Sequence, residues 1–167
     1  MTSQSIWVLA ADGDQACLYQ LNEVQKMIPM SGSEKHRYFE EKIELELEPV
    51  PDITLRAEKL YDYDQGFDKH GSPIHTVEAH QSTHEELKLR FMRTIALKLN
   101  HAFARGLFDK LVIVVPAHLL GEVRKHLDPD VMDCVIAELH KELVPCEAKE
   151  LLNHIRPTLV SFNPQAA

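Results

Sequence analysis

One short run of residues constrains the fold of this chain more than any other. Leu111–Val115 holds five consecutive apolar residues, of which four are β-branched. A strand with one solvent-facing side alternates apolar and polar residues, whereas an unbroken run of this length indicates a strand covered on both faces. The run therefore predicts a buried strand at the centre of an α/β domain, with further layers packed on each side.

The residues before this strand predict a long helix. Its apolar positions recur at four-residue spacing, which places them on one helical face; they are Leu87, Phe91, Ile95, Leu99 and Phe103. Ser82–Glu85 fits a capping box, and Gly106 stands where a glycine ends a helix. We expect a helix of about six turns that begins near Ser82.

Two further helices are predicted after the strand. Pro116 opens the first, whose inner face carries Leu119, Leu120, Val123 and Leu127. The second follows Pro145 and is expected to stop at Pro157, because proline interrupts helical hydrogen bonding. Between these helices, the apolar pattern of Val135–Leu143 fits either a strand or a helix.

The first half of the chain predicts strands. Ile6–Ala11 and Ala16–Leu21 are apolar runs around an Asp-Gly pair, which is a hairpin signal in which Gly13 supplies a positive φ. Lys42–Glu48 alternates strictly between charged and apolar residues, which predicts a strand with one wet face. Residues 22–41 are polar and are expected to form a loop.

These elements follow one another without a linker or an internal repeat. We therefore expect a single domain over residues 1–167, with a mixed β-sheet and helices packed on it. Residues 62–81 have the composition of a long loop, which in a domain of this size is functional or disordered. The tail over residues 158–167 is expected to fray.

Composition and charge narrow the classes of function. The three cysteines form no CxxC pair, and the N-terminus has no basic region, so we expect a cytoplasmic protein. Residues 1–80 hold 7 Lys/Arg and 15 Asp/Glu, whereas residues 81–167 hold 11 of each. This acidic excess repels phosphate backbones at long range, so we expect no DNA partner. No apolar run is long enough for membrane insertion.

Histidine is the first candidate for chemistry. His70, His75, His80 and His84 fall within fifteen residues, and an i, i+4 histidine pair on one helix can share a metal ion. The predicted helix begins after His80, so we interpret these side chains as solvent-facing loop residues and expect no metal site. A metal-assisted hydrolase that uses this histidine cluster stays open as an alternative.

Other catalytic signatures are missing from the sequence. It contains no GxSxG nucleophile elbow, and the surroundings of its cysteines suit core residues better than activated thiolates. It also lacks the glycine-rich nucleotide-binding loops, so we expect no cofactor. Arg124 and Lys125 lie in the last turn of a predicted helix, where cations interact favourably with the helix dipole. The same two side chains are candidates for contact with an anion or an RNA phosphate.

Several segments resemble the bacterial host attachment protein family. The resemblance is carried by Trp7–Gly13, Gly66–Asp68, His84 with Glu85, Phe91–Leu99, Gly106–Pro116, Leu119–Lys125, Glu138–Leu143 and Glu150–Ile155. That family is grouped with relatives of the middle domain of the archaeal and eukaryotic translation termination factor. The resemblance implies a ribonuclease-H-like α/β fold, and it favours a strand over a helix at Val135–Leu143.

The function of the termination factor transfers poorly to this chain. That factor acts through a Gly-Gly-Gln loop, which this sequence lacks, so we do not expect peptide release. We expect instead a non-catalytic intracellular binding protein that associates with the ribosome or with RNA. The candidate contact residues are Asp68, Lys69, His70, His84, Arg124 and Lys125. A homo-oligomeric interaction module, with strand 42–48 as an exposed edge, stays open as a further alternative.

Overall fold

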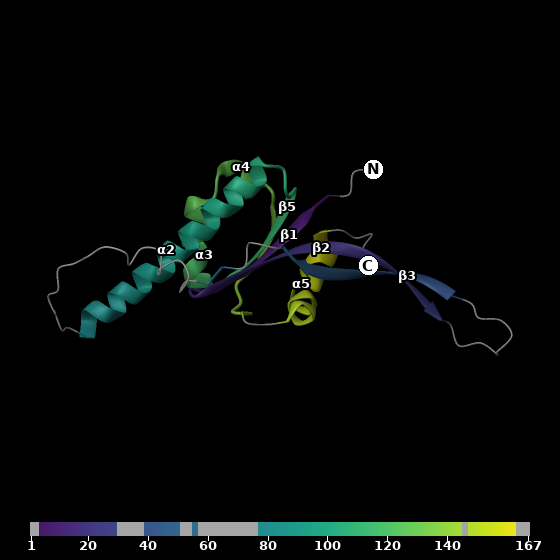
Figure 1. The fold of residues 1–167 in the computed structure, drawn as a ribbon, viewed down its shortest axis with the longest axis horizontal. Coiled ribbons are helices and arrows are strands. Elements are labelled where there is room, and N and C mark those ends of the chain that lie inside the picture. The colour runs from purple at the N-terminus through teal and green to yellow at the C-terminus, as the bar shows by residue number, and fades with distance from the viewer. Residues whose placement is uncertain (1–3, 30–38, 51–54, 57–76, 145–146, 163–167) are drawn as a thin grey trace.

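The computed structural model describes residues 4–29, 39–50, 55–56, 77–144 and 147–162. Their strands form one sheet in the order β3-β2-β1-β5-β6, and β4 also pairs with β2 (Figure 1). The strands are β1 (Ile6–Ala11), β2 (Gln15–Pro29), β3 (Phe39–Pro49), β4 (Leu55–Arg56), β5 (Lys110–Val114) and β6 (Val135–Leu139). The helices are α2 (Val77–Ala104), α3 (Ala117–His126), α4 (Pro129–Asp133) and α5 (Ala148–Phe162).

The sheet is mixed, as the sequence predicted. β1 runs antiparallel to β2 but parallel to β5, and β5 runs parallel to β6. Parallel neighbours need a long crossover connection, usually helical, and α2 returns the chain to the start of β5. The α/β class is confirmed, and Val135–Leu139 is a strand. The comparison with the ribonuclease-H-like fold stays a prediction.

The Leu111–Val115 run lies between two hydrophobic cores. Its odd-numbered residues belong to the core that α2, α3 and α4 cover. Its even-numbered residues belong to the core on the other face, which Leu151 and Ile155 of α5 close. All five side chains are buried. The prediction of a strand covered on both faces is therefore confirmed.

The hairpin between β1 and β2 is confirmed, but its glycine plays another role. The Asp12 carboxylate accepts hydrogen bonds from the backbone N–H groups of Asp14 and Gln15, each at 2.8 Å. Gly13 lacks the positive φ that we expected. Its backbone instead lies so close to α2 that an added Cβ would meet Lys88 Cγ at 2.5 Å. Glycine is needed here for the close approach of the turn to the helix.

The two ends of α2 compare differently with the prediction. The helix begins at Val77 rather than near Ser82, so the predicted capping box lies inside it. The loop that we expected over residues 62–81 is therefore wrong for residues 77–81, and residues 62–76 lie outside the described residues. The helix ends at Ala104, and Gly106 terminates it as expected with a positive φ of 71°. The Gly106 N–H donates to the Phe103 carbonyl at 2.9 Å, and the next N–H donates to the Ala102 carbonyl at 3.1 Å. These two bonds form a Schellman motif.

The last helix continues through its proline. α5 extends to Phe162 with Pro157 inside it, so the predicted stop at that proline is wrong. Leu159, beyond the proline, is buried against the sheet. Packing of this turn therefore outweighs the hydrogen bond that proline removes. The expected fraying is wrong for residues 158–162, and residues 163–167 lie outside the described residues.

β2 and β3 continue past the body of the sheet as a two-stranded arm, residues 22–29 and 39–46 (Figure 1). The loop that we expected over residues 22–41 is therefore wrong for residues 22–29 and 39–41. Residues 22–29 of β2 mix polar and apolar side chains without a period of two, so their sequence does not predict a strand. The alternating segment Lys42–Glu48 is confirmed as part of β3.

One cation links the two strands of the arm. The ammonium of Lys26 lies 2.8 Å from the carboxylate of Glu44 and 2.8 Å from that of Glu46. The hydrogen bond from Lys26 lowers the pKa of Glu44 below its ordinary value. In return, the two carboxylates raise the pKa of Lys26.

We expect Lys26→Met to raise the pKa of Glu44 toward its ordinary value, because the hydrogen bond that favours the carboxylate is removed. A carbon NMR titration of the glutamate side chains measures this shift. Since the pKa of Glu44 is lowered in the folded state, the pair stabilises the arm above the ordinary carboxylate pKa. That contribution is lost as the pH falls through the lowered value.

Lys42→Met is the matched control for this titration. The Lys42 ammonium lies 3.7 Å from the carboxylate of Glu44, so its removal is expected to shift the pKa less. Equal shifts in the two variants would contradict the assignment of Lys26 as the main partner of Glu44.

Alanine substitutions at Gly106 and Gly121 distinguish the effect of backbone strain on stability from the effect of side-chain packing. An added Cβ has no neighbouring atom within 4 Å at either Gly106 or Gly121. Gly106→Ala is expected to destabilise the fold by about 1 kcal/mol, because alanine disfavours a positive φ. Gly121→Ala, inside α3, is expected to stabilise it by up to about 1 kcal/mol. Urea unfolding measures both changes, and the same sign for both would refute the argument.

Candidate functional site

The described residues do not gather the predicted contact residues into one site. Asp68, Lys69 and His70 lie outside the described residues. His84 is exposed on α2, whereas Arg124 and Lys125 are exposed near the C-terminus of α3. These three residues thus come from two helices.

The prediction that His80 lies before the start of the long helix is wrong. Because α2 begins at Val77, His80 and His84 lie on one helix and not on either side of its start. The i, i+4 spacing that we set aside is therefore helical. His70 and His75 lie outside the described residues. Among the described residues, no group of three His, Cys, Asp or Glu side chains could hold a metal ion. The hydrolase alternative stays a prediction.

The basic end of α3 is engaged within the molecule. Arg124 Nε donates to the Glu138 carboxylate on β6 at 2.9 Å, and its terminal nitrogen bonds the other oxygen. This pairing raises the pKa of the Arg124 guanidinium. His126 Nε2 lies 2.9 Å from Glu122 Oε1. Of the two cations predicted to contact a partner, Arg124 thus already has an internal anion.

The described cysteines give no sign of a catalytic thiol. Cys134 is buried, and burial raises the pKa of its thiol. Its Sγ lies 3.0 Å from the Val131 carbonyl, to which the thiol donates. Cys17 is half-buried in β2, and Cys146 lies outside the described residues. Cys134 therefore behaves as the small core residue that the sequence predicted.

A basic strip that the sequence reasoning missed lies at the C-terminal end of α2 and in the turn after it. Its basic side chains are Lys98, His101 and Arg105, and none has an ion pair or side-chain hydrogen bond with the rest of the described chain. They line a shallow surface hollow together with Leu97 and Leu107, which are 50% and 41% exposed. The i, i+3, i+7 spacing of the cations is the signal that could have found this surface.

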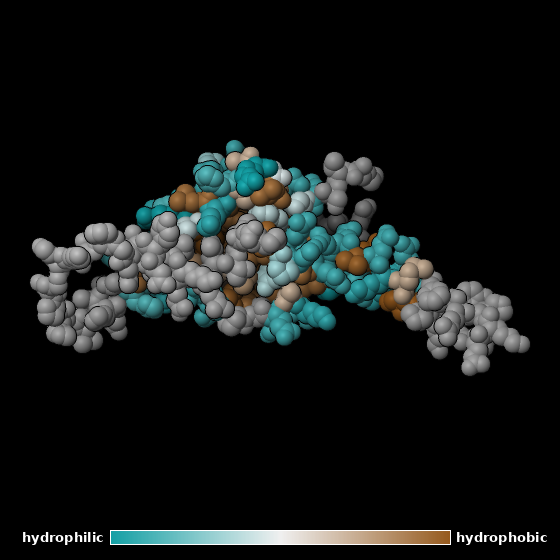
Figure 2. All heavy atoms as spheres, viewed as in Figure 1, coloured by the Kyte–Doolittle hydropathy of each residue, from teal (hydrophilic) through white to brown (hydrophobic). Residues whose placement is uncertain are grey.

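The arm exposes apolar side chains. Met27 on β2 is 64% exposed and Ile43 on β3 is 61% exposed. Figure 2 shows brown hydrophobic atoms on the arm among teal hydrophilic ones. A two-stranded hairpin is only marginally stable by itself in water. Met27 and Ile43 are therefore candidate contact residues.

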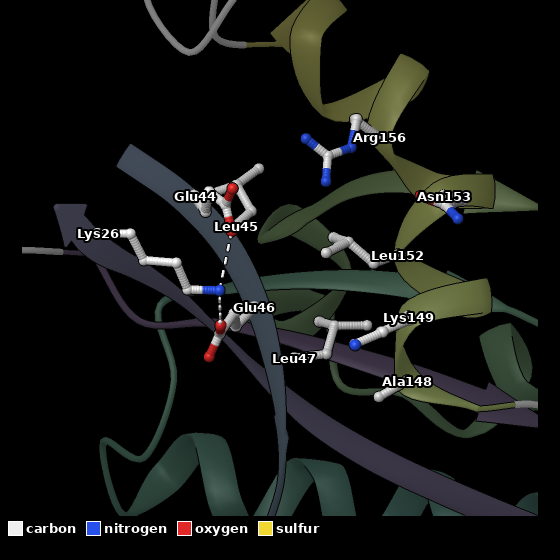
Figure 3. Close-up of a pocket in the computed structure, with 10 residues that line it drawn as sticks. All are labelled: Lys26, Glu44, Leu45, Glu46, Leu47, Ala148, Lys149, Leu152, Asn153 and Arg156. Atoms are coloured by element: carbon white, nitrogen blue, oxygen red, sulfur yellow. Dashed lines mark hydrogen bonds and ion pairs between the residues drawn. The ribbon is translucent and has the colours of Figure 1, made fainter. Parts of the chain in front are cut away.

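A groove runs along β3 where it faces α5 (Figure 3). Leu45 and Leu47 of β3 and Leu152 of α5 give it an apolar lining. Its volume is about 480 Å³. Lys149 and Arg156 lie on the α5 wall, and neither has an ion pair or a side-chain hydrogen bond with the residues that the structure describes. The groove therefore combines apolar surface with two uncompensated cations.

The two surfaces differ in what the sequence could reveal. The basic strip lies on one helix, so its spacing is local. The groove depends on where α5 lies relative to β3. More than half of the sequence lies between these two elements. Neither surface has the paired acid, base and nucleophile of a catalytic site.

No helix in the described part of the chain is long and apolar enough to cross a membrane.

Comparisons with known proteins identify the family. The search of curated proteins gives no match. A family model described as a protein required for attachment to host cells matches residues 7–155. This match covers most of the chain, including the core strand β5, all of β1 except Ile6, and α5 as far as Ile155. The chain therefore belongs to the host attachment family.

Proposed function

We propose that this chain is a non-catalytic cytoplasmic binding protein that contacts RNA through the basic strip of α2. The observation that carries the proposal is that the cations Lys98 and Arg105, with His101 between them, have no ion pair among the described residues. Cations that the fold does not neutralise are available to neutralise phosphates, and this contact dominates affinity for nucleic acids.

The distribution of charge supports this surface over the rest of the molecule. The whole acidic excess of the chain falls in residues 1–80, and residues 81–167 are balanced. The strip lies in the balanced half. Lys98 and Arg105 are two helical turns apart, about 10 Å along the axis. This span matches about three stacked nucleotides of one strand.

The ribosome is the proposed source of this RNA. The resemblance of the chain to relatives of a termination-factor domain supports a ribosomal partner. Arg124, predicted as a contact, is paired with Glu138, so the α2 cations replace it as the main contacts in the proposal. Lys125 is exposed and stays a secondary candidate.

Ribosome co-sedimentation at several salt concentrations tests the proposal. We expect the wild-type chain to enter the ribosomal fraction at low salt and to leave it as salt rises. Lys98→Gln combined with Arg105→Gln should weaken the association at every salt concentration. Each lost phosphate contact should also reduce the salt slope by about 1.

Lys149→Gln combined with Arg156→Gln is the matched control, because it removes the same charge from α5. It should leave the association unchanged. Loss of binding in both double variants would show a net-charge effect and contradict the strip. Total ribosomal RNA should compete with the ribosomes, whereas polyglutamate should not; equal competition would indicate an acidic protein partner instead. A wild-type chain that stays in the light fractions at low salt would also refute the proposal.

A further inference from the structure

β3 forms one edge of the sheet. It pairs with β2 over its 11 residues, and no strand of the described chain pairs with its other side. The unpaired side of an edge strand exposes N–H and C=O groups that can bond another extended chain. Natural proteins usually shorten or cover such edges, so a free edge of this length is a candidate binding feature.

The groove lies beside this edge. It places the apolar residues Leu45 and Leu47 next to α5. Ile43 continues the same row of side chains onto the arm, where it is exposed. An extended segment lying beside β3 would thus find backbone hydrogen-bonding groups, a hollow and uncovered apolar surface in one place. This combination is the geometry of binding by strand addition.

We propose that the free edge of β3 binds an extended segment of another protein as an added strand, and that this segment carries basic residues on one face and apolar residues on the other. The proposal concerns a different surface from the basic strip and does not depend on RNA binding. Its backbone hydrogen bonds would supply affinity, and the alternating side chains would supply specificity.

The charges of β3 determine the partner's chemistry. Successive side chains of a strand point to opposite faces. One face of β3 carries Lys42 and four glutamates, which are Glu40, Glu44, Glu46 and Glu48. Lys26 pairs with the central two glutamates; among the described residues Glu40 and Glu48 have no ion pair. Opposite charges on neighbouring strands stabilise their pairing, so lysine or arginine is expected at alternate positions of the partner.

A second copy of the chain fits this edge poorly. Two antiparallel β3 strands related by a twofold axis would place Glu44 opposite itself, Glu44 opposite Glu46, or Glu40 opposite Glu46, depending on the register. Each of these registers also places Lys42 opposite one glutamate, but like-charged glutamate pairs remain in all three. Like charges directly opposite each other destabilise paired strands. The homo-oligomer alternative is therefore disfavoured at this edge by charge.

A segment of the same chain also lacks the required chemistry. Residues 57–76 form the longest stretch outside the described residues, and they carry four acidic and two basic residues. Their net charge has the same sign as that of β3. Charge complementarity therefore favours a basic segment from another protein.

The test uses a short fluorescein-labelled peptide in which lysine and valine alternate, with fluorescence anisotropy on the full chain at physiological salt. A peptide with glutamate in place of lysine should bind about tenfold more weakly or not at all, because several charge pairs are reversed. Equal affinity for the two peptides would overturn the charge argument.

Two N-methylated peptides distinguish strand addition from simple charge attraction. In a strand, the N–H groups of alternate residues point to opposite edges. One peptide is N-methylated at every valine and the other at every lysine. We expect one of the two to lose binding and the other to retain it. Retention by both would overturn strand addition, since a polycation needs no backbone donors.

Variants then locate the site. Glu40→Gln combined with Glu48→Gln should weaken binding about fivefold, whereas Glu86→Gln combined with Glu142→Gln makes the same charge change elsewhere and should not. Ile43→Thr keeps a β-branched residue at an exposed position and should weaken binding through lost apolar contact. Hydrogen exchange should show added protection in β3 on peptide binding. Protection confined to α2 would overturn the proposal.

Discussion

The parallel pairing of β1 with β5 is the constraint on which the rest of the structure depends. The two strands pair from Ile6 with Lys110 to Ala10 with Val114, and both are buried on both faces. Backbone groups that water cannot reach must be paired within the sheet. β2 and β6 supply that pairing on the outer sides, while α2 to α4 and α5 supply the two covering layers. The surfaces that we propose for partner binding are then the edge strand and the solvent face of α2.

The sequence predicted those elements whose buried faces determine the spacing of their apolar residues. Leu111–Val115 is apolar at every position because both faces are covered, and α2 carries an apolar stripe because one face is. The β2 strand of the arm could not be predicted in this way, since residues 22–29 carry no period of two, whereas its β3 strand was predicted from the alternation of Lys42–Glu48. The predicted helix end at Pro157 is wrong for another reason. Local hydrogen bonding argues for a helix end there, but burial of Leu159 two residues later overrides it.

The candidate surfaces were predictable to different degrees. Arg124 was correctly placed in a basic helix end, but its partner Glu138 lies on β6 and only the fold brings them together. The cations of the basic strip were visible once the apolar stripe of α2 was assigned, because they recur on its solvent side. The groove could not be predicted, since it depends on how far α5 lies from the edge of β3. Tertiary placement, and not residue type, decides whether such surfaces exist.

The separation of charge along the molecule has a kinetic consequence. The acidic arm projects from the body on the side away from α2, and the uncompensated cations lie on that helix (Figure 1). The separation of the acidic arm from the basic strip therefore contributes an electric dipole moment to a molecule whose net charge is −8. In the field of a charged partner this dipole exerts a torque, so the chain rotates before it touches. Encounters then begin in a favoured orientation, which raises the association rate at low ionic strength and leaves the dissociation rate largely unchanged.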